Sequence, residues 1–364
     1  MTNEELLNLL RKHKERIANG RNTRILSDLD HAFTSWFSPA RLHSTKGHEL
    51  VIILSTRGCE HFLSGSSGCS MCGYNKDSAG EAVPPGSILN QFTNAIGKHD
   101  DDLSNNENIV LKIFNSGSFL DDGEISASIR EDILSRIASV PSIKEVAVES
   151  RPEFIKESNL EPFQSKLRDD QFKEIGIGLE TWNDTIRLEF INKGFTLNDF
   201  LDSNELLKNH GVGTKVYLFL KPLFLSELQA YKDIKHSLEQ LASLDNVSTI
   251  SINPAAIHKD TLMENLFSRR IYRPPWLWTT RLLVDEALKM RGTGGNPLIL
   301  CDPVAGGKHR GAHNCKDKKC NYTSLDLIKE STMEQEPAKG LNPLANGSNP
   351  SCNCFFEWID EMEL

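Results

Sequence analysis

The sequence predicts an α/β fold: a partial (β/α)6 TIM-type barrel with a helical N-terminal extension and a cysteine-rich C-terminal accessory region. Three features lead to this prediction: six β-rich apolar runs, helical stretches between them, and polar motifs directly after the strands. A strand followed by a helix, repeated six times, requires parallel strands with right-handed crossovers. The expected strands are residues 50–56, 109–114, 145–149, 174–179, 214–220 and 247–252.

The chain divides into three predicted segments. Residues 1–44 form a basic helical extension, whose charged face either contacts nucleic acid or is simply solvated. Residues 45–255 form the barrel core, with helices expected over residues 125–140 and 225–244. Residues 256–364 form the accessory region, which contains one more short strand and a stretch rich in Pro, Gly, Asn and Ser.

Composition limits the function classes. Hydrophobic residues make up 38% and charged residues 25% of the 364 residues, which is typical of a globular protein. The apolar runs are too short to cross a membrane, and the charged N-terminus does not resemble a secretory signal, so we expect a cytoplasmic protein with no membrane partner. A net charge of -9 argues against tight, unaided binding to nucleic-acid phosphates.

Three cysteines lie close together directly after the first expected strand. Cys59, Cys69 and Cys72 have nine and two residues between them, in a loop rich in Gly and Ser. Three thiolates can hold a 4Fe-4S cluster and leave one iron open, as chelation of S-adenosylmethionine requires. Tyr74 would form a wall against the adenine of that cofactor. The alternative is a zinc site with His61 as its fourth ligand.

Polar residues also follow the later strands, where a parallel sheet binds its ligands. They could contact the ammonium, ribose and carboxylate groups of S-adenosylmethionine, or they could form ordinary turns and surface ion pairs. These candidates are Asn115, Ser116, Gly117, Ser118, Glu149, Ser150, Arg151 and Glu180.

Four further cysteines form two close pairs near the C-terminus. Cys315 and Cys320 make one pair, and Cys352 and Cys354 make the other. Four thiolates suit a tetrahedral structural zinc site, while a second iron-sulfur cluster and free thiols are the alternatives. Cys301, near the end of a short apolar strand, is expected in the core.

A segment rich in aromatic residues and arginine lies in the accessory region. Arg273, Trp276 and Trp278 could hold a splayed nucleotide, since bases stack on indole and guanidinium groups, and His313 is a further candidate for substrate binding. Alternatively, the aromatic rings pack against the open edge of the barrel.

Several ordered motifs resemble one known family. They are residues 115–121 (NSGSFLD), 149–153 (ESRPE), 178–181 (GLET), 191–194 (INKG), 272–278 (YRPPWLW), 302–303 (DP) and 310–315 (RGAHNC). Together with the cysteine spacing, they resemble the elongator-catalytic-subunit-like branch of the radical S-adenosylmethionine enzymes, and within it the archaeosine synthase radical subunits. The resemblance to the branch covers roughly residues 40–300, and the motifs at 302–303 and 310–315 extend the resemblance to the archaeosine synthase subunits beyond that range.

This resemblance implies a 4Fe-4S cluster held by the first three cysteines, with S-adenosylmethionine as the second cofactor. It implies a transfer RNA substrate that carries lysine on 7-cyano-7-deazaguanosine at position 15. A 5'-deoxyadenosyl radical would abstract a hydrogen from the lysine moiety, after which the lysine carbon-nitrogen bond breaks and archaeosine remains. The implied partners are an electron donor and a lysine-transferring subunit with an RNA-binding domain.

Two alternatives to this function remain open. One is an enzyme of the same branch that acts on another transfer RNA nucleoside or on a protein side chain. The other is a non-enzymatic iron-sulfur or zinc scaffold. Acetyltransfer, as in the elongator subunit, is set aside because the accessory region is too short for an acetyltransferase domain.

Overall fold

The computed structural model describes residues 28–291, 295–345 and 352–363, together with Glu4, Asn8, Leu9, Arg11, Lys12 and Glu15. The chain forms two compact units, each built from two stretches of sequence. The first unit is Met1–Gly178 with Gly194–Lys215, and the second is Leu179–Lys193 with Val216–Leu364. Most of the predicted N-terminal helix lies outside the described residues, and the boundaries at residues 44 and 255 stay a prediction.

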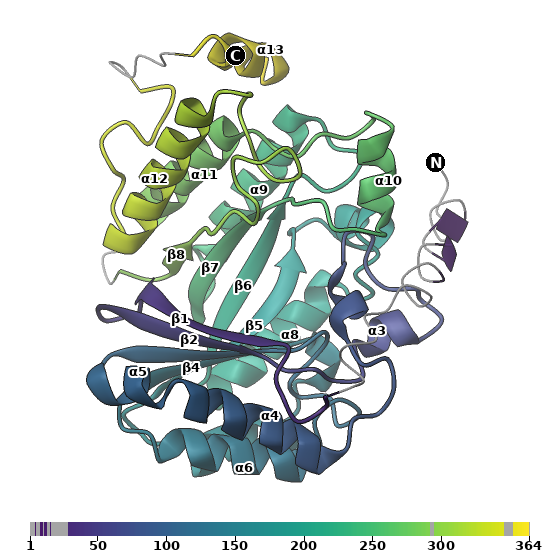
Figure 1. Ribbon diagram of the computed structural model, residues 1–364. Helices are drawn as coiled ribbons and strands as arrows, with labels where there is room; N and C mark the ends of the chain where they lie inside the picture. Colours follow the sequence, from purple (N-terminus) through teal and green to yellow (C-terminus); the bar gives the residue numbers. More distant parts are fainter. Residues whose placement is uncertain are drawn as a thin grey trace. The chain divides into compact units, whose positions relative to one another are not determined.

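The strands confirm the predicted α/β fold. They form one eight-stranded sheet in which each strand neighbours the next along the chain, the strand order of a partial barrel (Figure 1). The strands are β1 Thr34–Arg41, β2 Lys46–Ile53, β3 Ile109–Phe114, β4 Ile143–Ser150, β5 Phe172–Glu180, β6 Gly213–Leu220, β7 Val247–Pro254 and β8 Leu298–Leu300. All six strands expected in the core are present, as is the short strand after them.

One strand was not predicted from the sequence. β1 pairs antiparallel with β2, in register from Thr34 opposite Ile53 to Arg41 opposite Lys46. It lies in the segment that we expected to be helical. Its sequence contains Pro39, which cannot donate to a strand ladder and is tolerated only in an edge strand such as this one. From β2 to β5 every described pairing is parallel.

The helices of the first unit connect its parallel strands. α4 and α6 contact each other and lie side by side in Figure 1. Each buries an apolar face, with Ile88 and Phe92 on α4 and Ile133 and Ile137 on α6. The helices are α3 Glu60–Leu63, α4 Pro85–Lys98, α5 Asp100–Asn105, α6 Ala127–Ala138, α7 Glu157–Ser165 and α8 Leu197–Asn209.

The second unit centres on α11, which is buried along most of its length and contacts α9, α12 and β8. Ser226 begins α9 with a capping box, in which its side chain accepts from the Gln229 N–H. The helices are α9 Glu227–Leu241, α10 Leu262–Ser268, α11 Leu277–Met290, α12 Lys318–Glu334 and α13 Cys354–Glu361. Within the described parts of the chain, no helix has both the length and the apolar character that a membrane span needs.

Candidate active site and metal centre

The three-cysteine loop follows β2 in the first unit. Cys59, Cys69 and Cys72 are all half-buried, and none forms a disulfide. The loop doubles back tightly at Gly68, which has a φ of +75°. A Cβ atom there would lie 2.9 Å from the Phe62 ring, so only glycine fits this position.

Asn75 links the two ends of this loop. Its side-chain oxygen accepts from the Cys59 backbone N–H at 3.2 Å, and its amide donates to the Cys72 sulfur at 3.6 Å. The side chain is 1% exposed, so both contacts are shielded from water. Asn75 therefore holds the first and third cysteines in a fixed relation. The neighbouring Tyr74 is 55% exposed, which leaves its ring accessible to a ligand.

The spacing of these thiols bears on which metal group they could hold. Among the described residues, the one group of three or more ligand atoms that all lie within 4.8 Å of one another is elsewhere, so the three cysteine sulfurs do not form such a compact set. A cube of irons separates its thiolates more than one tetrahedral ion does. Burial raises the pKa of Cys59 to about 11, opposed in part by the Arg151 cation. A bound metal would displace that proton.

The loop after β3 contacts the cysteine loop directly. Ser116 donates a hydrogen bond to the backbone oxygen of Tyr74 at 3.2 Å. Gly117 passes so close to Cys59 that a Cβ atom on Gly117 would lie 2.6 Å from the Cys59 Cα. The structure thus brings the two predicted segments together, and Gly117 is the residue that allows their close approach.

Glu124 organises the rest of this region. Its carboxylate accepts from Thr56, from the Asn115 side-chain amide at 2.8 Å, and from the Ser118 backbone N–H at 2.7 Å. Burial raises the pKa of Glu124 to about 7. The Asn115 Oδ1 atom is buried without a hydrogen-bond partner. A buried acceptor of this kind calls for a donor, and the ammonium group of S-adenosylmethionine would supply one.

The end of β4 joins the same region. The Ser150 and Ser118 hydroxyls lie 2.8 Å apart, so the third predicted segment contacts the second. Arg151 forms an ion pair with Glu153 and lies over the Phe195 ring at 5.5 Å. Glu149 is half-buried at the end of β4.

Glu180 belongs to the second unit. It has a φ of +68°, and it forms a 2.6 Å ion pair with Lys193 in which both side chains are largely buried. The family motif at residues 191–194 therefore supplies the partner of this carboxylate. A role of Glu180 toward S-adenosylmethionine stays a prediction.

The four C-terminal cysteines converge in the second unit. The sulfurs of Cys315, Cys320, Cys352 and Cys354 all lie within 4.8 Å of one another. Cys315 and Cys352 are 3.6 Å apart, and Cys320 and Cys354 are 3.8 Å apart. A tetrahedral ion with zinc-sulfur bonds of about 2.3 Å places its thiolates about 3.8 Å apart. We call these four residues the four-thiolate group.

Tail helices hold the four-thiolate group in place. Cys320 lies on α12, and Cys354 is the first residue of α13. The Asn314 amide donates to the Cys320 sulfur at 3.5 Å, a neutral contact that leaves the thiolate charge for a cation. Neither His309 nor His313 belongs to the group, and Cys301 is buried as expected.

The aromatic residues that were predicted to bind substrate are buried rather than exposed to solvent. Trp276 and Trp278 are 3% and 5% exposed and pack in a cluster with Trp358. Their burial favours the alternative prediction, in which the aromatic rings pack within the fold, because a base cannot stack on a covered indole face. Arg273 lies 3.7 Å from the Trp276 ring centroid and donates to the backbone oxygens of His313 and Asn314.

Comparison with known proteins decides the family. The chain is 37% identical to the archaeosine synthase subunit beta of Methanosarcina acetivorans, over 91% of this chain and 89% of that one. It is 35% identical to the protein of the same name from Thermococcus kodakarensis, over 91% and 97%. This chain belongs to the archaeosine synthase subunit beta family. The predicted resemblance is confirmed.

Other comparisons add less to this assignment. An uncharacterised protein of Methanocaldococcus jannaschii is 39% identical over 87% of this chain and 83% of its own length. No family model matches the chain. Among solved structures, the Methanocaldococcus infernus Elp3 protein matches with a TM-score of 0.47 at 12% identity, over 68% of this chain and 61% of that one. The family assignment rests on the sequence relatives alone.

Two residues of this archaeosine synthase family member were missed in the sequence. Asn75 follows the noted Tyr74, and Glu124 lies three residues beyond the 115–121 motif. Neither residue type has a characteristic spacing for this role. Their functions arise from contacts made by the fold, and the one available signal was their closeness to recognised motifs.

Proposed function

We propose that this chain is the radical S-adenosylmethionine subunit of archaeosine synthase. The observation that carries the proposal is the direct contact between three predicted segments within the first unit. The cysteine loop, the Asn115–Ser118 loop and the end of β4 interlock through Gly117 and the Ser118–Ser150 pair. They do so in a chain that is 37% and 35% identical, over 91% of its length, to two subunits of that name.

The residues present have assignable roles toward the two cofactors. Cys59, Cys69 and Cys72 would hold a 4Fe-4S cluster with one open iron. Asn115 would accept from the ammonium of S-adenosylmethionine, and Arg151 would exchange Glu153 for the cofactor's carboxylate. When bound, the two cofactors would supply a 5'-deoxyadenosyl radical, which would take a hydrogen atom from the lysine moiety before the carbon-nitrogen bond of that substrate radical breaks.

Glu124 would hold the Asn115–Ser118 loop in the conformation that binds the cofactor. With its pKa raised to about 7, the carboxyl is partly protonated near neutral pH. Both forms can bind the Thr56 hydroxyl, while the Asn115 amide and Ser118 N–H donate to the ionised form. Glu124 thereby orients the Asn115 side chain so that its oxygen is available to an incoming ammonium group.

The substrate would be a transfer RNA bearing lysine-modified 7-cyano-7-deazaguanosine, and the product would be archaeosine. The relatives are named subunit beta, which supports a partner subunit. A net charge of -9 agrees with a chain that relies on a partner's RNA-binding domain to hold the transfer RNA. An external electron donor would reduce the cluster.

The four-thiolate group would bind one zinc ion. Its sulfur separations of 3.6 and 3.8 Å match the edge of a tetrahedron around a single ion and are too short for a cluster. Replacing zinc with cobalt in the purified protein should give the intense visible absorption of tetrahedral thiolate coordination. Cys352→Ser should remove that signal, and a cobalt spectrum unaffected by this change would contradict the assignment.

A reconstituted assay tests the reaction. The protein is loaded with iron and sulfide under anaerobic conditions, then incubated with S-adenosylmethionine, dithionite and lysine-modified transfer RNA. Mass spectrometry of the nucleosides should detect archaeosine. Cys301→Ala serves as the control, since Cys301 lies outside both cysteine groups and the variant should keep this activity.

The same assay separates the alternatives. Formation of 5'-deoxyadenosine without archaeosine would show a radical enzyme with another substrate. A colourless protein that contains zinc and no iron after reconstitution would instead indicate a scaffold.

A further inference from the structure

A cavity in the second unit lies directly after the end of β6. Its volume is about 380 Å³, within the range of small-molecule sites. Lys221 is the first residue after β6, and Phe224 and Glu227 follow it along the cavity wall. The carboxyl end of a parallel strand is where α/β proteins place their ligands.

The backbone around this cavity has unusual conformations. Lys221 and Phe224 have φ angles of +69° and +72°, and Arg270, which precedes the lining residue Ile271, has +61°. Side chains other than glycine rarely adopt this region, and such residues gather at binding sites. Phe224 is 42% exposed and Ile271 is 69% exposed, so two apolar side chains remain at the cavity in contact with solvent.

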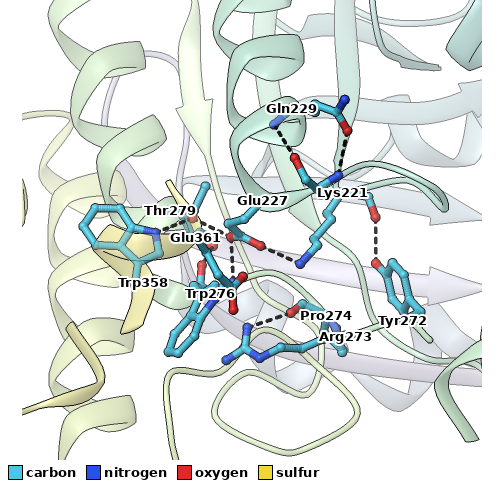
Figure 2. A network of polar contacts seen from close by, with 12 residues as sticks. Lys221, Glu227, Gln229, Tyr272, Arg273, Pro274, Trp276, Thr279, Trp358 and Glu361 are labelled. Atoms are coloured by element: carbon cyan, nitrogen blue, oxygen red, sulfur yellow. Dashed lines mark hydrogen bonds and ion pairs between the residues drawn. The ribbon is translucent and has the colours of Figure 1, made fainter. Parts of the chain in front are cut away.

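Charges of both signs line the same cavity. Lys221 forms a 2.6 Å ion pair with Glu227, and both side chains are almost fully buried. Glu227 also accepts from the Trp276 backbone N–H at 2.9 Å and from the Thr279 hydroxyl. Figure 2 shows these contacts converging on Glu227. The pair fixes the Lys221 ammonium and uses one of its three protons, which leaves two donors.

Glu361 provides the opposite charge. It accepts a 3.0 Å hydrogen bond from the Trp276 indole, and the hydrogen bonds described for this chain include none to its other oxygen. Glu361 ends α13, the helix that begins at Cys354 of the four-thiolate group. Arg273 also lines the cavity. The hydrogen bonds described for its side chain are donated by the two terminal nitrogens and do not use the Nε–H group.

We propose that this cavity binds the zwitterionic amino-acid group of a modified nucleoside. The carboxylate of that group pairs with Lys221 and Arg273, and its ammonium pairs with Glu361. Its hydrocarbon chain packs against Phe224, Ile271 and Leu266. This inference rests on the proposed function, in which the substrate nucleoside carries a lysine.

The mixed charge of the lining excludes two simpler ligands. A phosphate group would meet the Glu361 carboxylate, which repels it. An unmodified base carries no charge and would offer neither an anion to Arg273 nor a cation to Glu361. An amino acid with a free ammonium and a free carboxylate satisfies both signs at once.

Equilibrium binding of two transfer RNAs to the full chain together with its partner subunit tests the proposal. One carries lysine-modified 7-cyano-7-deazaguanosine, and the other carries 7-cyano-7-deazaguanosine alone. The wild-type protein should prefer the lysine-bearing form. Glu361→Gln should reduce that preference about tenfold and leave the affinity for the other form unchanged, because a charge-assisted hydrogen bond is lost.

Glu361→Gln keeps an acceptor for the Trp276 indole, so the fold should be retained with an unchanged thermal midpoint. Asp360→Asn is the matched control: it removes the same charge one residue earlier on α13 from an exposed side chain, and the preference should persist. A preference that survives Glu361→Gln would overturn the inference. Tighter binding of both transfer RNAs by this variant would also overturn it, because that result indicates a phosphate site.

A wild-type protein that binds both transfer RNAs equally would also overturn the inference. The archaeosine assay described above, run at saturating transfer RNA, then decides separately whether the proposed function stands. Archaeosine formation without a binding preference would reject this cavity alone.

Discussion

The two cysteine groups of this chain differ in number, spacing and surroundings. The first unit holds three thiols on one loop, and they do not form a set in which all sulfurs lie within 4.8 Å of one another. The second unit holds four thiols within 4.8 Å of one another, brought together from α12, α13 and the segments before them. An incomplete set leaves a coordination position for a reactant, whereas a complete set leaves none. The comparison therefore supports the proposal that the first group serves chemistry and the second serves structure.

The neighbours of each group support the same division. Around the three-cysteine loop lie a buried Asn115 oxygen without a partner and a Glu124 carboxyl whose pKa is raised to about 7. Such unsatisfied and perturbed groups are typical of functional sites. Around the four-thiolate group lie the packed rings of Trp278 and Trp358. Close apolar packing is typical of a site that holds structure together.

Removing one thiolate from the first group should have the largest effect on activity. Cys69→Ala should abolish cleavage of S-adenosylmethionine, since two thiolates cannot retain the cluster. The measurement is 5'-deoxyadenosine formed under dithionite, with Cys301→Ala as the control. Cleavage that persists in Cys69→Ala would rule out the cluster assignment.

Removing one thiolate from the four-thiolate group should instead lower stability. Cys352→Ser should reduce the free energy of unfolding by several kcal/mol, on the order of 3 or more, because metal binding contributes directly to folding. Denaturant unfolding with and without a chelator measures this. Wild-type protein should be sensitive to the chelator and the variant should not. Equal sensitivity in both would argue against a structural metal here.

Glu124 should make stability depend on pH. Burial raises its pKa from 4.5 to about 7, so between these values the folded chain holds a proton that the unfolded chain releases. Its contribution is fully present below pH 4.5 and is lost as the pH rises through 7, by at most about 3 kcal/mol. Glu124→Gln should flatten this part of the profile in urea unfolding at several pH values. An unchanged slope would contradict the raised pKa.

The smallest expected effect concerns Asn75. Asn75→Ala leaves the Cys59 backbone N–H without its acceptor and should cost about 1–3 kcal/mol. Iron should also leave the reconstituted protein faster, because the first and third cysteines are no longer linked. Cys301→Ala provides the control, since Cys301 lies outside both cysteine groups. Equal rates of iron loss in both variants would exclude a specific role for Asn75.

Much of this arrangement could be predicted from the sequence, because the informative features are local. Cys59, Cys69 and Cys72 lie within one loop, and the strands appear as β-rich apolar runs. β1 was missed because Pro39 and its polar neighbours conceal a strand that is defined only by its pairing with β2. Glu124 was missed because its role depends on three groups that the fold brings to it.

The tryptophans show what could not be predicted from the sequence. An aromatic segment flanked by arginines is compatible with a buried cluster as well as with a nucleotide surface, and burial of Trp276 and Trp278 depends on α13, far along the chain. The convergence of the two C-terminal cysteine pairs likewise depends on tertiary structure. The four cysteines could be identified in the sequence, but the separations of 3.6 and 3.8 Å between their sulfurs depend on the fold.

Metal content, determined element by element on one set of proteins, tests the division between the two cysteine groups most directly. The anaerobically reconstituted wild type should contain about four irons and one zinc per chain. Cys69→Ala should lose the iron and keep the zinc, and Cys352→Ser should lose the zinc and keep the iron. Loss of both metals from each variant, or iron in the four-thiolate group, would contradict the account.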